Sequence, residues 1–344
     1  MKQAEKTRLR VEKLAQMLQD KTHLLIVMQD NPDPDSIAAA VALRKLANTM
    51  GNVQCSIMHG GTVGRGENRA LVRYLDLNLR AVEEIDFEKF DLIAMVDTQP
   101  GTGNNSLPER LIPDIVIDHH PFRRATARAQ LIDIRSGYGA TATIVYRYLQ
   151  QAGIVPDVPL ATALLYAIRS DTQDLGREAA RADIEAIGSL YGAANKRMLS
   201  EIQRGKVQRE YYRMLVTALQ NAKIYHNCII TTLGEINVPD MVGEVADLLL
   251  RDDVAAWTLG YGVFREKLLL SIRTSEVSKR ADKVMRGVVA RRGTGGGHDT
   301  IAGGQIPLRK GTKAEVSKIE KIVRQKFLRI VGVENHLGER LIGP

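Results

Sequence analysis

The sequence contains little cysteine, few aromatic residues and no long hydrophobic run. Its two cysteines, Cys55 and Cys228, are isolated and fit no metal-binding spacing, which excludes a disulfide framework and is typical of reduced thiols in a cytoplasmic protein. Aromatic residues make up only 5%, so the cores must be aliphatic. No apolar run approaches the roughly 20 residues of a membrane span. The charged N-terminus opens an amphipathic stretch and is not typical of a signal peptide.

Length and charge indicate two domains and anionic ligands. A chain of 344 residues is long enough for two domains, and an apolar share of 44% supports globular folding. Lysine and arginine number 48 against 40 acidic residues, which gives a net charge of +8. This excess favours negatively charged ligands, although many soluble proteins carry as much charge for solubility.

The pattern of apolar residues predicts an α/β domain over residues 1–192, with a parallel sheet and helices on both faces. Short apolar runs predict strands at 24–28, 53–58, 92–96 and 115–117. Helical spacing predicts helices at 4–19, 139–151 and 160–169, and a further helix capped by Asp35 or Ser36.

The remaining sequence predicts a helical linker over 193–220 and a smaller α+β domain over 221–344. Segments 222–233 and 254–273 are typical of antiparallel strands, with a helix at 240–250 between them. Further elements are expected as a helix at 279–290, a glycine loop, a strand near 303–307 and a helix at 313–330.

Clusters of carboxylates and imidazoles follow the predicted strands of the first domain. Asp33 and Asp35 follow the first strand, Asp97 follows the run at 92–96, and Asp118-His119-His120 follows the run at 115–117. Asp171 lies near the end of a predicted helix. Because ligands collect at the carboxyl ends of parallel strands, these side chains are expected to meet. Oxygen ligands with imidazole suit two divalent cations, with Mn²⁺ favoured and Mg²⁺ as the alternative.

Each cluster also has an ordinary structural explanation. An Asp-X-Asp sequence is usually a turn or a helix cap, an aspartate after a strand often caps the next helix, and paired histidines are often surface residues. The four clusters together, in this order and with three at strand ends, favour a metal site. Two cations would stabilise the attacking and leaving oxygens of a phosphoryl transfer, with a hydroxide as the attacking group.

The four clusters resemble the first four motifs of the DHH phosphoesterase family. The segment Gly295-Gly296-Gly297-His298 is similar to the glycine-rich signature of the substrate-binding domain associated with that family. The resemblance covers nearly the whole chain and is to the branch of nanoRNases, 3′-phosphoadenosine-5′-phosphate phosphatases, cyclic-dinucleotide phosphodiesterases and RecJ-type exonucleases. It implies an N-terminal metal domain and a C-terminal substrate domain.

The resemblance also implies roles for single residues. Asp33 would bind the first metal and Asp35 the second, with Asp97 bridging the two. His119 and Asp171 would complete the second site. In the reaction, His120 would lie beside the phosphate as electrostatic partner or general acid, together with His119 and Asp97, while Asp118 would orient the histidines.

One position departs from the family pattern. The first motif usually opens with a histidine four residues before the first aspartate, and this chain has Gln29 there. A glutamine offers only a neutral carbonyl oxygen, a weaker ligand for Mn²⁺ than imidazole. The first metal site is therefore expected to be looser than in the family, with an active enzyme still favoured over an inactive one.

The C-terminal domain is expected to bind the rest of the substrate. Consecutive glycines, Gly295 to Gly297, would bring backbone N–H groups close to an anion as a phosphate-binding nest, and His298 would add a side-chain donor. Arg273 ends an apolar strand and would grip a phosphate with two hydrogen bonds, although a solvated strand end is nearly as good an interpretation.

These features predict a metal-dependent phosphoesterase that acts on short oligonucleotides or small nucleotides. One alternative is a single-strand-specific exonuclease, which would require a basic groove with stacking aromatics. Another, suggested by Gln29, is a nucleotide-binding or sensing protein with weakened catalysis. A nucleotide or oligonucleotide is the expected partner and a membrane is not, while a homodimer is left open.

Overall fold

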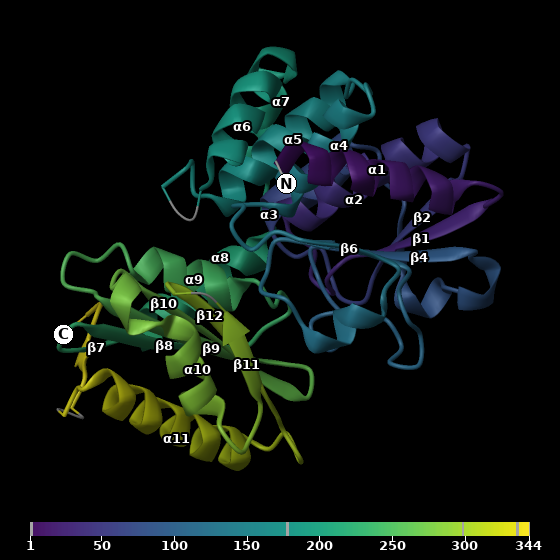
Figure 1. The fold of residues 1–344 in the computed structure, drawn as a ribbon. Coiled ribbons are helices and arrows are strands. Elements are labelled where there is room, and N and C mark those ends of the chain that lie inside the picture. The colour runs from purple at the N-terminus through teal and green to yellow at the C-terminus, as the bar shows by residue number, and fades with distance from the viewer. Residues whose placement is uncertain (1–2, 177–178, 298, 335–336, 344) are drawn as a thin grey trace. The chain divides into compact units, whose positions relative to one another are not determined.

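The computed structural model of the chain describes residues 3–176, 179–297, 299–334 and 337–343. Its backbone divides into two compact units, Met1–Lys206 and Val207–Pro344. Figure 1 shows that each unit consists of a sheet with helices packed on it. The predicted linker over 193–220 is divided between the units, since its two helices fall on either side of residue 206. The domain boundaries at 192 and 221 stay predictions.

The first unit is built on a six-stranded sheet whose neighbouring strands are all parallel. The strands are β1 (His23–Val27), β2 (Gln54–His59), β3 (Leu79–Ala81), β4 (Leu92–Val96), β5 (Ile115–Asp118) and β6 (Leu131–Ile134). Their order is β3-β2-β1-β4-β5-β6, so the direction of winding reverses between β1 and β4. In an open parallel sheet, the crevice at such a reversal is where ligands bind.

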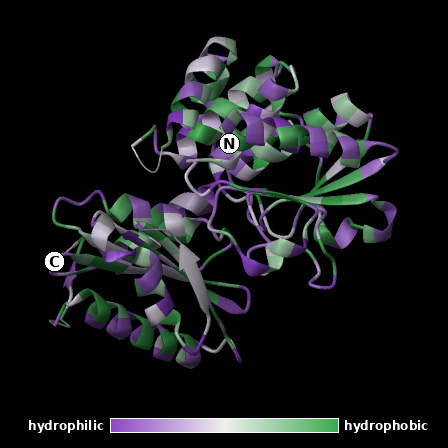
Figure 2. Cartoon of the chain, viewed as in Figure 1, coloured by the Kyte–Doolittle hydropathy of each residue, from purple (hydrophilic) through white to green (hydrophobic). Residues whose placement is uncertain are grey.

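The two faces of this sheet are covered differently. On one face, α1 (Gln3–Leu18), α2 (Pro34–Gly51) and α4 (Thr141–Gln151) lie against the strands. Behind them, packed on helices, are α3 (Gly66–Tyr74), α5 (Val158–Asp171), α6 (Arg181–Ala193) and α7 (Lys196–Gln203). The other face carries loops and the short 3₁₀ helices η1 (Val82–Glu84) and η2 (Phe87–Lys89), with a further 3₁₀ helix, η3 (Arg124–Arg128), before β6. The predicted α/β fold is confirmed, with short 3₁₀ helices in place of α-helices on the second face. Figure 2 shows how hydrophobic the strands between these layers are.

The helix after β1 begins two or three residues earlier than the sequence analysis expects. Asp33, and neither Asp35 nor Ser36, is the N-cap of α2, because its Oδ1 accepts a hydrogen bond from the Ser36 N–H at 2.9 Å. Pro34 occupies the first helical position, where its missing N–H costs no hydrogen bond, and the cap therefore falls on the preceding residue. Asp35 lies inside the first turn and is only 1% exposed.

The second unit is a seven-stranded mixed sheet covered on both faces by helices. Its strands are β7 (Lys223–Tyr225), β8 (Cys228–Glu235), β9 (Trp257–Phe264), β10 (Lys267–Thr274), β11 (Thr294–Gly297), β12 (Ile301–Pro307) and β13 (Glu339–Arg340), in the order β11-β12-β10-β9-β8-β7-β13. The helices α8 (Arg209–Asn221) and α9 (Met241–Leu249) pack on one face. The helices α10 (Ala281–Val289) and α11 (Lys313–Val331) pack on the other, with the 3₁₀ helix η4 (Val277–Lys279) before α10.

The pairing of the strands at the centre of this sheet corrects one expectation. Segments 222–233 and 254–273 each fold into a hairpin, β7–β8 and β9–β10, and these hairpins are antiparallel. The pair β8–β9 is instead parallel. The helix α9 connects β8 to β9, and a helical crossover returns the chain to the start of the neighbouring strand, which makes the pair parallel.

The glycine segment is a strand and not a loop. Residues Gly295 and Gly296 pair antiparallel with Gly304 and Gly303 as part of β11. In a strand, successive N–H groups point in opposite directions, so the predicted nest at these glycines is wrong. The space above the strand is narrow, because a Cβ on Gly295 or Gly304 would lie 2.7 or 2.5 Å from the side chain of Met285 on α10.

Candidate metal centre

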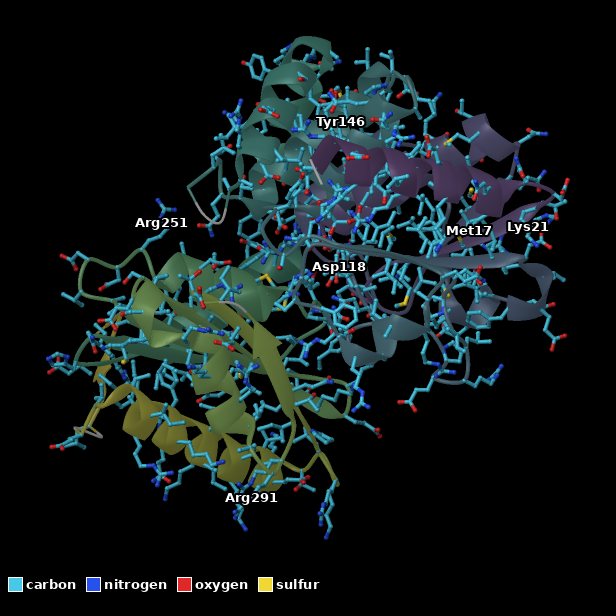
Figure 3. The ribbon with its side chains drawn as sticks, viewed as in Figure 1. Met17, Lys21, Asp118, Tyr146, Arg251 and Arg291 are labelled. Atoms are coloured by element: carbon cyan, nitrogen blue, oxygen red, sulfur yellow. The ribbon has the colours of Figure 1, made fainter. Side chains whose placement is uncertain are left out.

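Acidic and imidazole side chains converge at the reversal point of the first sheet. Asp97 follows β4 directly, and Asp118 is the last residue of β5, with His119 and His120 next in the chain. The last residue of α5, Asp171, also reaches this edge. Asp118 is labelled in Figure 3, at the edge where the strands of the first unit end. Residues far apart in the sequence therefore face one another, as the sequence analysis expects.

Two groups of three side chains are close enough to hold metal ions. Asp35, His119 and Asp171 form one group, and Asp97, His119 and His120 form the other; within each group the ligand atoms lie within 4.8 Å of one another. The first group contains all the residues assigned to the second metal apart from the bridging Asp97. Because His119 belongs to both groups, the two candidate positions are neighbours.

Asp97 is held in a strained and buried position. Its φ of +57° lies in the left-handed region, which costs a residue other than glycine about 1–3 kcal/mol. Its Oδ1 accepts a hydrogen bond from the Thr141 hydroxyl at 3.0 Å, and the side chain is 1% exposed. Burial, followed by the charges of the nearby aspartates, raises its pKa well above the usual range. Strain and charge crowding at one buried residue are typical of a functional site.

Asp35 occupies the N-terminus of a helix from another part of the chain. Its two oxygens accept hydrogen bonds from the backbone N–H groups of Thr141 and Ala142, at 2.7 and 2.8 Å, in the first turn of α4. Burial and the charge of Asp33 raise the pKa of Asp35 to about 7, although these two N–H groups act in the opposite direction. The N-terminus of α4 therefore orients the Asp35 carboxylate, while burial and the charge of Asp33 make its ionised form unfavourable.

The hydrogen bonds of His119 determine which of its nitrogens faces the acids. Its Nδ1 lies 3.1 Å from the carbonyl oxygen of Tyr138, which can only accept, so Nδ1 carries the hydrogen. Its Nε2 then faces Asp171 Oδ2 at 3.2 Å and Asp97 Oδ1 at 3.6 Å. This is the arrangement of a metal-binding histidine, whose other nitrogen is held by a backbone carbonyl.

His120 is oriented by Asp118, which is held in turn by Gln99. The Nδ1 of His120 lies 2.8 Å from Asp118 Oδ1, and the Gln99 amide donates to Asp118 Oδ2 at 2.7 Å. Burial opposes a charge on His120, but the hydrogen bond and the charge of Asp118 raise its pKa. In Asp118 burial also acts against the charge, and the contact with His120 nevertheless lowers its pKa. Asp118 thus orients His120 and favours its protonated form.

The other predicted ligands of the first metal, Asp33 and Gln29, make different contacts in the structure. Asp33 uses Oδ1 to cap α2, although its charge contributes to the raised pKa values of Asp35 and Asp97. The Gln29 side chain lies beside Asp97, with its Nε2 3.5 Å from Asp97 Oδ2. Gln29 therefore presents an amide N–H to the position where the family histidine would present a lone pair.

Several supporting residues were not predicted from the sequence. Thr141 contacts both Asp97 and Asp35, and Asp183 of α6 holds the same loop through the Gly139 N–H at 2.8 Å and the Thr143 hydroxyl at 2.5 Å. Gln99 was also missed. The signal available in the sequence is weak: Thr141 and Thr143 are polar residues in the first turns of α4, among alanine, isoleucine and valine, where a buried hydroxyl needs a partner.

The substrate-binding residues predicted in the second unit have mixed outcomes. Gly295 to Gly297 lie in β11, and His298 falls outside the described residues. Arg273 is 7% exposed and forms an ion pair with Asp247, at 2.5 Å from Nε to Oδ1. Its Nη1 donates to Ser271 Oγ at 2.5 Å. The guanidinium of Arg273 is therefore already occupied by the protein, which argues against the predicted grip on a phosphate.

The residues at the first site fit divalent cations. Burial and the charges of Asp33, Asp35, Asp118 and Asp171 raise the pKa of Asp97, and a cation among these carboxylates would relieve the repulsion. Carboxylate oxygens combined with an imidazole nitrogen suit Mn²⁺, and also Mg²⁺ where the imidazole is replaced by water.

In the described part of the chain, no helix is long and apolar enough to cross a membrane.

Comparisons with known proteins agree with this architecture. The chain is 34% identical over 321 residues to an uncharacterized protein of Methanocaldococcus jannaschii, a match that covers 91% of this chain and 65% of the length of that relative. It is 22% identical over 218 residues to a protein named as a probable manganese-dependent inorganic pyrophosphatase of Staphylococcus saprophyticus, covering 61% of this chain and 69% of the other.

A solved structure has the same fold. The crystal structure of an exopolyphosphatase-related protein from Bacteroides fragilis superposes with a TM-score of 0.72 at 14% identity, over 94% of this chain and 98% of that one. Two family descriptions match the sequence itself: the DHH family, N-terminal domain, over residues 23–168, and the DHHA1 domain over residues 226–327. The first half of the chain therefore carries the N-terminal domain of the DHH family, and the second half carries a DHHA1 domain.

Proposed function

We propose that the protein is a metal-dependent phosphoesterase that hydrolyses phosphodiester or phosphomonoester bonds of short oligonucleotides or small nucleotides. The observation that carries this proposal is the meeting of Asp35, Asp97, His119 and Asp171 at the reversal point of the first sheet. The N-terminal domain of the DHH family and the likeness to a protein named as a probable manganese-dependent inorganic pyrophosphatase support a hydrolase that uses Mn²⁺ or Mg²⁺.

In this proposal, Asp35, His119 and Asp171 would hold one cation, Asp33 would hold another, and Asp97 would contribute to both. When bound, the cations would supply positive charge to the phosphate and lower the pKa of a water molecule. Thr141 keeps Asp97 and Asp35 in place, and the Tyr138 carbonyl keeps the Nε2 of His119 directed at the acids.

His120 is proposed as the proton donor to the leaving oxygen. Its Nδ1 is engaged by Asp118, so the proton available for transfer is on Nε2, and the side chain is 37% exposed and thus accessible to a substrate. Against the effect of burial, the hydrogen bond and the charge of Asp118 raise the pKa of His120, which favours the protonated form. A general acid with a pKa close to the working pH transfers its proton most effectively.

The second unit is proposed to bind the remainder of the substrate through the backbone of Gly295 to Gly297 and the side chain of His298. Because β11 is an edge strand, one set of its N–H and C=O groups is not used in the sheet and is available to a ligand. The proposal does not extend to Arg273, whose guanidinium holds Asp247.

A substrate panel tests this function. The protein is stripped of metal, supplied with Mn²⁺ and incubated with dinucleotides, short RNA and DNA, 3′-phosphoadenosine-5′-phosphate, long single-stranded DNA and pyrophosphate. We expect a dinucleotide, a short oligonucleotide or the bisphosphorylated nucleoside to be hydrolysed fastest, and no hydrolysis with EDTA.

Other outcomes of the panel would point to different functions. Preference for long single-stranded DNA would favour an exonuclease, and hydrolysis of pyrophosphate alone would favour a pyrophosphatase. Tight binding of a nucleotide without turnover in Mn²⁺ would support the sensing alternative. Each of these results would contradict the proposed substrate class.

We also propose that the protein is cytoplasmic, since its two free thiols, Cys55 and Cys228, suit a reducing compartment. Burial raises the pKa of both thiols, to about 11 and 12, which keeps them protonated and unreactive.

A homodimer is proposed as the assembly to test by light scattering of the purified protein.

A further inference from the structure

We propose that the outer face of α11, together with Arg291 and Arg292, is a docking surface for the phosphate backbone of single-stranded nucleic acid. This surface lies in the second unit and shares no residue with the candidate metal centre of the first. The proposal goes beyond the hydrolytic function, because strand binding at this surface requires neither metal nor turnover.

The positive charge of the chain is concentrated in the second unit. Residues 207–344 contain 22 lysines and arginines against 15 aspartates and glutamates, an excess of seven in a chain whose net charge is +8. Within this unit, α11 alone has six basic residues and two acidic ones. The excess positive charge is therefore located in one part of the molecule and is not spread evenly over its surface.

The basic residues of α11 form an exposed stripe. Lys318, Lys321, Gln325 and Arg329 follow one another at helical spacing, and all four are exposed. The apolar residues Val323, Phe327 and Leu328 are buried in the core of the second unit. Figure 2 shows the resulting division of α11 into hydrophobic and hydrophilic sides.

The two acidic residues of α11 are turned to other partners. Glu315 accepts hydrogen bonds from the backbone N–H groups of residues 309–311, at 2.8 to 3.0 Å, near the start of the helix. Glu320 accepts from the Thr232 hydroxyl at 2.9 Å and is half-buried. In the described ranges, neither forms an ion pair with the exposed lysines and arginines of the helix.

Two further arginines extend the stripe at the end of α10. Arg291 and Arg292 are exposed, and Arg291 is labelled in Figure 3 on the outer side of the second unit. Lys326 links the two helices, since its Nζ donates to the Val288 and Ala290 carbonyls at 3.3 and 3.2 Å. Burial, then Arg292, Arg329 and Arg291, lower the pKa of Lys326, which places these four cations near one another.

The cations at this end are available to a ligand. Among the residues that the structure describes, Arg291, Arg292 and Arg329 form no ion pair, and Arg329 and Lys326 line a pocket of about 500 Å³. Glu334 lines the same pocket and is the acidic residue there. Arg291 follows α10 with a φ of +66°, in the left-handed conformation that often ends a helix.

The chemistry of this surface fits a polyphosphate strand. Guanidinium groups bind phosphate with two parallel hydrogen bonds. A helix of 19 residues is about 28 Å long at 1.5 Å per residue, which is long enough to contact several consecutive phosphates of a strand. A membrane fits poorly, since the apolar side of α11 is buried in its own core. The stripe contains no aromatic residue, so binding should be independent of sequence and sensitive to salt.

The test compares two triple variants of the full chain with equal changes in charge. The first replaces the stripe, Lys318→Gln, Lys321→Gln and Arg329→Gln. The control replaces Arg251, Arg265 and Lys267, three exposed cations of the same unit outside α11, with glutamine. Binding of a fluorescent 20-nucleotide single strand is measured by anisotropy in EDTA over a series of salt concentrations.

We expect the stripe variant to raise Kd about tenfold or more and to reduce the slope of log K against log salt by about 2, since each phosphate contact contributes about 0.7. The control variant should change Kd less than twofold, and both should keep the unmodified Tm. Equal losses in the two variants, or no loss in the first, would overturn the docking surface. Tighter binding of anionic vesicles than of the strand would overturn the choice of partner. Because EDTA removes turnover, none of these results depends on the proposed hydrolysis.

Discussion

At the scale of the residue, the candidate site is made of side chains whose charges are costly without a cation. Asp35 and Asp97 are buried among other carboxylates. The Nε2 of His119 faces Asp97 and Asp171. The ligand types were predictable, because aspartates and histidines at strand ends are visible in the sequence. Thr141 and Gln99 were not, since their roles depend on which loops the fold brings together.

Replacement of Asp97 separates metal binding from folding. Asp97→Asn should lower turnover by about 10³-fold or more, because several kcal/mol of charge stabilisation is lost. The metal-free protein should melt no lower than the unmodified one, since a neutral amide relieves the crowding of carboxylates. Activity assays and melting curves with and without Mn²⁺ measure both effects. A variant that Mn²⁺ still stabilises as much as the unmodified protein would exclude Asp97 as a ligand.

Thr141 is expected to act through the two ligands that it contacts. Thr141→Val removes the hydroxyl that donates to Asp97 and should weaken Mn²⁺ affinity about 10- to 100-fold, as loss of such supporting contacts typically does. Thr141→Ser keeps the hydroxyl and should restore most of the affinity. Calorimetric titration with Mn²⁺ measures the difference. Equal affinity in the two variants would show that the hydroxyl has no part in holding Asp97.

Gln29 offers a test in the opposite direction. Gln29→His would place an imidazole beside Asp97, where the present amide lies 3.5 Å from Oδ2. Imidazole is a better ligand for Mn²⁺ than an amide, so we expect tighter binding at the weaker of two sites in the same titration. An unchanged titration curve would mean that Gln29 lies outside the coordination shell.

The raised pKa values of Asp35 and Asp97 predict a pH dependence of stability. In the metal-free protein the folded state keeps protons on these groups that the unfolded chain releases near pH 3.8, so their contribution to stability falls as pH rises from about 4 to 7. Melting in EDTA should occur at higher temperature at pH 6 than at pH 8. The double variant Asp35→Asn, Asp97→Asn should lose most of this difference, and a difference of the same size in the double variant would assign it to other groups.

At the scale of the element, the sequence predicted the buried parallel strands and long amphipathic helices well. The runs at 92–96 and 115–117 became β4 and β5, because continuous apolar residues leave few alternatives to a buried strand. Prediction from the sequence failed where the conformation of a segment depends on pairing with a distant strand. The segment Thr294–Gly297 contains three consecutive glycines, which disfavour a strand, and it becomes one by pairing with β12.

The contact between α3 and the end of α7 gives a prediction at this scale. A Cβ on Gly205 would lie 2.1 Å from the backbone carbon of Gly66 and 2.3 Å from the Glu67 nitrogen, where the backbone cannot yield easily. Gly205→Ala should therefore destabilise the protein by about 1–3 kcal/mol. Gly192→Ala in α6, where a Cβ meets nothing within 4 Å, should instead stabilise it by about 0.5–1 kcal/mol. Denaturant unfolding of both variants measures these changes, and equal stabilities would contradict the close packing at Gly205.

At the scale of the whole molecule, the two units divide the chemistry between them. The first unit gathers carboxylates at the reversal point of a parallel sheet, and the second carries nearly all of the excess positive charge. The order of the motifs was enough to predict the family and both fold classes. The parallel β8–β9 pair and the occupied guanidinium of Arg273 could not be predicted, because they depend on the crossover of α9 and on the position of Asp247.

The central claim is that Asp35, Asp97, His119 and Asp171 together hold divalent cations. Anomalous scattering from crystals grown with Mn²⁺ tests it most directly. We predict two neighbouring manganese peaks, one bonded to Asp35, His119 and Asp171 and both in contact with Asp97. Crystals soaked in excess Mn²⁺ with no peak among these four side chains, or with the only peaks elsewhere on the protein, would contradict the claim.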